Sequence, residues 1–259
     1  MAPQLLIYNT AIPVTQGRHR NWYLETTPNY AFSRQTNSVP LMAVEFPQAS
    51  ADYTIVFAGA GEEYLPAVIL GVRDDENLFV DQNDTWAASY VPAFVRRYPF
   101  VFSQSENQFM LCIDEAFPGF NQDGRGQKLF DQDGKPSLYV NGVMKFLQEY
   151  QAQFLRTQQF CGRLRDLGLL EPMQAQVTTD AGRKLSLSGF MAVSRAKLKD
   201  LPDNVVAELL KSDELELIYM HLHSMRNFER LRERLALTEA TRASASLAAM
   251  PGNGFLQVH

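Results

Sequence analysis

The chain has 259 residues, with 24 lysines and arginines against 29 aspartates and glutamates, so its formal net charge is -5. Hydrophobic residues make up 46% of the chain and charged residues 20%, which are ordinary proportions for a globular protein. This composition excludes a disordered, collagen-like or disulfide-built chain. The acidic balance also excludes binding to nucleic acid through a basic surface, so we expect no nucleic-acid partner.

The cysteines and the lengths of the apolar runs indicate the cellular compartment and whether the chain spans a membrane. Cys112 and Cys161 both lie in apolar sequence, and two thiols are too few for a disulfide framework, so we expect buried free thiols in a reducing interior. The first residues lack the basic segment and the apolar core of a signal peptide. The longest apolar runs, 53–60 and 64–72, are far shorter than the ~20 residues that a spanning helix needs. We therefore expect a cytoplasmic protein with no membrane span.

Residues 1–140 are predicted to form a β-rich part with one embedded helix. Short apolar runs alternate there with turns rich in Asp, Asn and Gly, residues that tolerate tight turn conformations. This spacing favours a mostly antiparallel, partly curled sheet. The candidate strands are 43–46, 54–57, 67–70, 78–80, 100–102, 109–113 and 138–140.

The embedded helix is predicted over 85–98. Aromatic residues recur there every four positions, a spacing that places them on one helical face. They are Trp86, Tyr90, Phe94 and Tyr98. Pro92 is unfavourable inside a helix, so two short turns are an alternative to one continuous helix.

Residues 141–237 are predicted to add helices and a β-hairpin that pack on the first part as one compact unit. A long amphipathic helix is expected over 141–167, followed by a hairpin of 174–179 and 184–193 that turns through 180–183. Gly189 favours a bulge that redirects Phe190. The predicted fold class is therefore α+β.

The remaining helices follow the hairpin. Ser194 is a suitable N-cap for a short helix, and Pro202 suits the first turn of another. A last helix is expected over 213–235. Residues 238–259 are rich in Ala, Ser and Gly and are predicted to be a weakly ordered tail.

Three motifs resemble known sites but fit turns or core residues better. Residues 59–61, Gly-Ala-Gly, lack the third glycine and the helix of a dinucleotide fingerprint. Residues 131–134, Asp-Gln-Asp-Gly, lack the glutamate that completes a calcium loop. In His221-Leu-His223 the two rings would point apart on a helix, with His221 at the edge of the buried stripe and His223 toward solvent. We therefore expect no metal and no cofactor.

The richest candidate binding segment is 86–100, where adjacent arginines lie among aromatic residues. Consecutive side chains point in different directions, so one of Arg96 and Arg97 is expected inside and one outside. Asp114 and Glu115 are natural partners in a structural Arg–carboxylate network, and the alternative is that the guanidinium groups bind an anionic group such as a peptide carboxylate. The candidate ligand-binding residues are Trp86, Tyr90, Arg96, Arg97, Tyr98, Asp114, Glu115 and His221.

The same segment resembles the signature of the bacterial SapC family. Further blocks match in order and approximate spacing, and the likeness covers residues 5–235. These blocks are 37–40, 45–46, 66–71, 111–115, 129–134, 187–190 and 218–224.

The family name is shared with a permease of a peptide transporter and is associated with surface-layer proteins. Genes of the family often lie near flavin-dependent halogenases, cupin-like oxygenases and TonB-dependent receptors. The resemblance thus implies an accessory role in modifying or handling a peptide or another imported compound. The resemblance assigns no catalytic residues to this chain.

These observations favour a soluble accessory or binding protein with a peptide or protein partner, which is able to oligomerise. The first alternative is a tailoring enzyme with a non-standard acid–base or metal site, in which Asp114, Glu115, Tyr90 and His221 share one pocket. The second alternative is a surface-layer-associated protein. No common nucleophile motif is present, which favours binding over catalysis.

Overall fold

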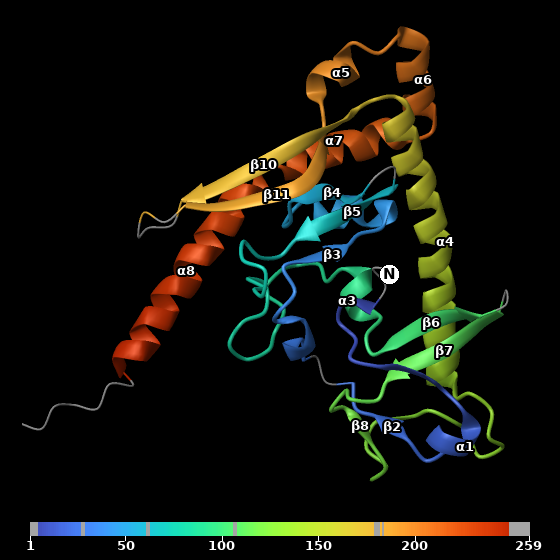
Figure 1. The fold of residues 1–259 in the computed structure, drawn as a ribbon. Helices are drawn as coiled ribbons and strands as arrows, with labels where there is room; N and C mark the ends of the chain where they lie inside the picture. The colour runs from blue at the N-terminus through green and yellow to red at the C-terminus, as the bar shows by residue number, and fades with distance from the viewer. Residues whose placement is uncertain are drawn as a thin grey trace, which may run out of the picture.

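The computed structural model describes residues 5–26, 29–60, 63–105, 108–178, 182 and 184–248. It has antiparallel sheets, one long helix, a β-hairpin and C-terminal helices (Figure 1), which confirms the predicted α+β class. Within the described residues, no helix combines the length and the apolar character needed to cross a bilayer.

The main sheet has five strands in the order β10-β11-β4-β5-β3, and all neighbouring strands are antiparallel. The hairpin formed by β10 and β11 pairs with β4, so strands from both predicted parts of the chain share one sheet. The bounds are β3 (Ser38–Pro40), β4 (Ile55–Ala60), β5 (Glu63–Ile69), β10 (Leu170–Thr178) and β11 (Lys184–Val193).

Two smaller sheets, each of three strands, are formed by N-terminal residues. One has the order β1-β7-β6, and the other has the order β8-β2-β9. Their strands are β1 (Ala11–Pro13), β2 (Tyr23–Leu24), β6 (Phe100–Ser105), β7 (Gln108–Asp114), β8 (Phe120–Asn121) and β9 (Gln127–Lys128). Two short helical turns, α1 (Gln16–His19) and η2 (Ala31–Ser33), lie between the early strands.

The long helix α4 (Leu138–Asp166) packs against β5 and continues past the main sheet to β6 (Figure 1). It begins earlier than predicted because Ser137 caps it, accepting a hydrogen bond from the Val140 N–H at 3.3 Å. The strand predicted over 138–140 is therefore wrong, since these residues form the first helical turn. Gly168, with φ +65°, follows the last turn.

Three other predictions in the N-terminal part are wrong. Residues 43–46 form the 3-10 helix η3 (Ala43–Glu45) and the start of α2 (Phe46–Ala49), in which a proline in the first turn favours the helix. Residues 78–80 form no strand, and only Val80 makes a bridge, to Trp86. The helix predicted over 85–98 is reduced to α3 (Ala93–Arg96), because Pro92 stays extended and begins it.

The bulge in the hairpin and the turn at 131–134 agree with the sequence. The β10–β11 register shifts opposite Gly189, which has φ +85°, so the predicted bulge is confirmed. Its turn, 180–183, lies outside the described residues except for Gly182. At Gly59 a Cβ would lie 1.9 Å from the Glu63 carbonyl oxygen, so the hairpin of β4 and β5 requires glycine there. Residues 131–134 form a turn in which the Asp131 N–H donates to the Lys135 carbonyl at 2.8 Å.

The C-terminal helices are α5 (Arg195–Lys199), α6 (Asp203–Lys211), α7 (Glu214–Ser224) and α8 (Asn227–Ala248). The single helix predicted over 213–235 is wrong, because Ser224 and Asn227 both bind the chain before and at the start of β4. The Ile55 N–H donates to Ser224 Oγ at 3.0 Å, and Asn227 Nδ2 donates to the Tyr53 carbonyl at 2.8 Å. Helix α8 continues to Ala248, so 238–248 of the predicted tail are helical and 249–259 lie outside the described residues.

Candidate functional site

A buried carboxylate organises one group of the predicted site residues. Glu45 is 4% exposed, and its Oε1 accepts hydrogen bonds from the Tyr90 hydroxyl and the Ala93 N–H, both at 2.7 Å. Its Oε2 accepts from the Met42 N–H at 2.8 Å. Burial raises the pKa of Glu45, and the two backbone donors act in the opposite direction. Glu45, which sequence reasoning did not select, thus joins η3 to α3.

Arg96 lies on the exposed side of this group. Its Nη2 donates to the Tyr90 hydroxyl at 3.2 Å, and its Nε donates to the Val91 carbonyl at 3.0 Å. The guanidinium carbon lies 5.6 Å from the Tyr90 ring centre and 5.4 Å from that of Phe146. Burial, together with Glu45, raises the pKa of Tyr90 to about 12, so this hydroxyl stays protonated at neutral pH.

Trp86 belongs to the adjacent hydrogen-bond chain. Its Nε1 donates to the Tyr53 hydroxyl at 2.7 Å, and that hydroxyl donates to the Tyr90 carbonyl. Both Trp86 and Tyr53 are buried. Trp86 therefore fixes the irregular segment before α3 against the core.

Arg97 is buried, as predicted for one member of the arginine pair, with 3% of its surface exposed. Its guanidinium carbon lies 4.3 Å from the Phe94 ring centre, 5.0 Å from Tyr150 and 5.7 Å from Tyr8. Burial raises the pKa of Tyr8, and the positive charge of Arg97 opposes this effect. These contacts join α3 to α4 and to the N-terminal segment.

We expect substitution of the two arginines to have unequal effects on stability. Arg97→Met removes a desolvated charge from three rings and is expected to cost about 2 kcal/mol, whereas Arg96→Met, at the surface, is expected to cost less than about 1 kcal/mol. Urea unfolding of both variants measures this difference. Equal losses would contradict the assignment of Arg97 to the core.

The two acidic candidates have partners other than the arginine pair, so the expected network with Arg96 and Arg97 is wrong. Asp114 is buried and accepts from the Asn9 N–H at 2.7 Å and from the Tyr98 hydroxyl at 3.3 Å. Glu115 binds the Arg18 guanidinium at 2.5 Å and His19 Nε2 at 2.8 Å. The Arg18 and His19 contacts lower the pKa of Glu115, against the effect of desolvation.

His221 lies in the core beneath the main sheet and not at the edge of a buried stripe. Its Nε2 accepts from the Val193 N–H at 3.0 Å, and its Nδ1 lies 2.9 Å from the Ile55 carbonyl oxygen. Burial lowers the pKa of His221 to about 4. It joins α7 to β4 and β11, whereas His223 is exposed as predicted.

The eight candidate residues therefore fall into separate groups. Tyr90, Asp114, Glu115 and His221 each bind different partners: Glu45, Asn9, His19 and Val193. Among the described residues, no group of three or more His, Cys, Asp or Glu is arranged to hold a metal ion. A role of the eight residues in ligand binding stays a prediction.

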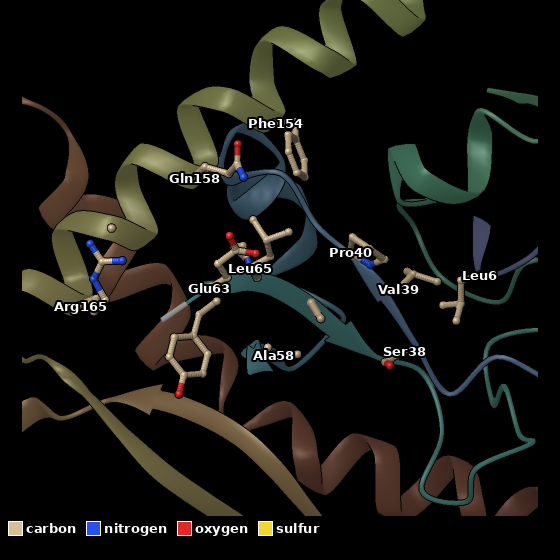
Figure 2. Close-up of a pocket in the computed structure, with 15 residues that line it drawn as sticks. Leu6, Ser38, Val39, Pro40, Ala58, Glu63, Leu65, Phe154, Gln158 and Arg165 are labelled. Atoms are coloured by element: carbon tan, nitrogen blue, oxygen red, sulfur yellow. The ribbon is translucent and has the colours of Figure 1, made fainter. Parts of the chain in front are cut away.

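A cavity of about 750 Å³ lies elsewhere, between α4 and the β3 side of the main sheet. Figure 2 shows Phe154, Gln158 and Arg165 of α4 on one side, with β5 and β3 on the other. Apolar side chains form much of the wall, and Glu63 and Arg165 supply charges of opposite sign. The other wall residues include Leu6, Val39, Pro40, Leu65, Pro66 and Ala67.

Strand β3 brings backbone polar groups to this cavity. The Leu41 N–H donates to the Pro66 carbonyl, and the Asn37 carbonyl accepts from the Leu70 N–H. The backbone groups of the odd-numbered residues of β3 therefore point toward β5, and those of the even-numbered residues point toward the outer edge of the sheet. Within the described residues, the N–H of Ser38 and the carbonyls of Ser38 and Pro40 have no hydrogen-bond partner. Both residues line the cavity, so its wall contains an open sheet edge.

The sequence did not predict this cavity, although two segments of its wall have recognisable features in the sequence. Residues 37–40 belong to the blocks that resemble a known family, and Gly162 interrupts the predicted long helix. Gly162 lines the cavity, and a Cβ built there meets no atom within 4 Å. Only the pairing of β3 with β5 brings these parts together.

A family model described as SapC matches residues 14–231. The chain belongs to the SapC family. No curated protein and no solved structure gives a match. The SapC match includes β3, β5 and α4, the elements that form most of the cavity wall.

Proposed function

We propose that this SapC protein binds an extended peptide in the cavity between α4 and β3. The observation that carries the proposal is the open edge of β3 within a largely apolar wall. An extended peptide that lies along such an edge gains main-chain hydrogen bonds, while alternate side chains enter pockets. The Ser38 N–H and the Ser38 and Pro40 carbonyls are the groups that it would pair with.

The charges at the cavity support a peptide over a plain hydrocarbon. Glu63 lies at the start of β5, and Arg165, which also binds Asp166 at 2.8 Å, lies in the last turn of α4, so the wall contains one acidic and one basic group. A peptide carries both kinds of complementary charge in its termini or side chains. Phe154, Leu65 and Pro40 supply apolar surface for side chains between them.

A peptide-holding role agrees with the accessory function implied by the family resemblance. In this proposal the protein holds a peptide on which other proteins act. We also propose a cytoplasmic location, which two buried free cysteines support.

The test uses peptides selected from a displayed library of random octapeptides. A synthetic copy of an enriched sequence is titrated with the full chain by fluorescence polarisation. Gly162→Leu places a side chain in the cavity and is expected to weaken binding by at least about tenfold, since it excludes ligand atoms from the apolar wall.

Gly142→Leu is the matched control, because Gly142 lies on the same helix, is exposed and also has open space around its Cβ position. Both variants are expected to keep the fold, since leucine is a better helix former than glycine. Equal affinity of the two variants, or failure of the library to enrich any peptide, would contradict the proposal.

A further inference from the structure

A second cavity, of about 520 Å³, lies between α8 and the loop that follows β5. Its charged wall residues are balanced, with three arginines and three carboxylates. They are Arg34, Arg234, Arg242, Asp75, Glu76 and Asp81. A balanced wall disfavours a multiply charged anion and suits a ligand that carries both charges.

Glu76 provides an acceptor that lacks a donor. It is 4% exposed, and its Oε1 binds Arg73 Nη1 at 2.8 Å and Arg242 Nη1 at 3.3 Å. Its Oε2 is buried and has no hydrogen-bond partner in the part of the chain that the structure describes. Because leaving a buried acceptor without a donor costs about 1–3 kcal/mol, a ligand that donates a hydrogen bond there gains that energy.

Arg234, on α8, provides a positive charge in the wall of the same cavity. Its Nη2 donates to the Ala87 carbonyl at 2.6 Å, and its guanidinium carbon lies 4.3 Å from the Phe79 ring centre. Among residues 5–248 as described, no carboxylate lies within ion-pair distance of this half-buried group. Burial lowers the pKa of Arg234, and the charge of Asp52 opposes this effect from beyond ion-pair distance, as an anion in the cavity would.

We propose that this cavity binds a small zwitterion of the amino-acid class. The Glu76 side chain turns Oε2 toward the cavity to accept a hydrogen bond from the ligand ammonium group, and the ligand carboxylate pairs with the Arg234 guanidinium. Arg34 is already engaged with Asp84, so Arg234 is the stronger carboxylate receptor. This site is separate from the peptide cavity, and the proposal does not depend on that function.

The test titrates the isotope-labelled full chain with glycine, β-alanine, 4-aminobutyrate and 5-aminovalerate, which differ in the distance between their charges. Saturable shifts of the backbone amide signals of Glu76, Ala87 and Arg234 are expected for the zwitterion whose length fits. Butylamine and butyrate carry only one of the two charges, so each is expected to bind at least about tenfold more weakly than the best amino acid.

Two variants and a control complete the test. Glu76→Gln and Arg234→Met are each expected to weaken binding by at least about tenfold. Arg232→Met, on the same helix but outside the cavity wall, is expected to leave it unchanged. If Glu76→Gln does not fold, the affinity of Arg234→Met alone decides the test. No saturation by any amino acid at about 10 mM, equal binding of butylamine or butyrate, or full affinity in Arg234→Met would overturn the proposal.

Discussion

Glu45→Ala is expected to lower the free energy of unfolding by about 4 kcal/mol. The substitution leaves the Met42 and Ala93 N–H groups and the Tyr90 hydroxyl without their acceptor in a buried region. Each buried donor that loses its partner costs about 1–3 kcal/mol, and the fixed cost of burying the carboxylate is recovered in part. Urea unfolding of the full chain at neutral pH measures the change.

Glu45→Gln separates the hydrogen bonds from the charge. Glutamine keeps one acceptor oxygen but presents a donor to the remaining partner, so its expected cost is smaller, about 2 kcal/mol. Glu233→Ala, at an exposed position of α8, is the control and is expected to change stability by less than about 0.5 kcal/mol. A loss in Glu45→Ala no larger than that of the control would show that Glu45 does not join η3 to α3.

The second large effect is a loss of about 3 kcal/mol of stability between pH 6.5 and pH 4 through His221. The pKa of His221 is about 4 in the folded protein and 6.5 as a free group. The unfolded chain therefore binds the proton first as the pH falls. This contribution to stability is complete above pH 6.5 and is lost as the pH falls toward 4.

The contacts of His221 explain why the charged ring is disfavoured. A second ring proton would face the Val193 N–H, which needs Nε2 as an acceptor, while Nδ1 already lies by the Ile55 carbonyl. We expect His221→Gln to flatten the dependence of unfolding free energy on pH in this range. His223→Gln is the matched control, because His223 is exposed, and it should retain the wild-type slope. Identical slopes in wild type and His221→Gln would refute this explanation.

The elements that the sequence predicts well are those in which periodicity is long. The stripe along α4 and the alternation in the β10–β11 hairpin extend over enough residues to fix the element type. Two of the errors fall on runs of three or four residues, at 43–46 and 138–140, which are too short for periodicity to fix the element type. There a helix cap or a first-turn proline decided the conformation, through Ser137 and Pro47.

The candidate site shows a different limit. The sequence predicted that one arginine of the pair is buried and the other exposed, but not which one, and it did not find their environment, because the contacts come from distant segments. Tyr90 binds Glu45, 45 residues away, and His221 binds Ile55, 166 residues away. The cavity beside β3 is formed by backbone groups and a glycine, which leave no charge pattern in the sequence.

Hydrogen exchange of the Ser38 amide in the full chain, with and without a selected peptide, tests directly whether a peptide pairs with β3. A saturating peptide is expected to slow exchange at Ser38, whose N–H faces the open edge of β3, and to leave exchange at Val39, whose N–H faces β5, little changed. A peptide that binds tightly without slowing exchange at Ser38 would contradict pairing along β3.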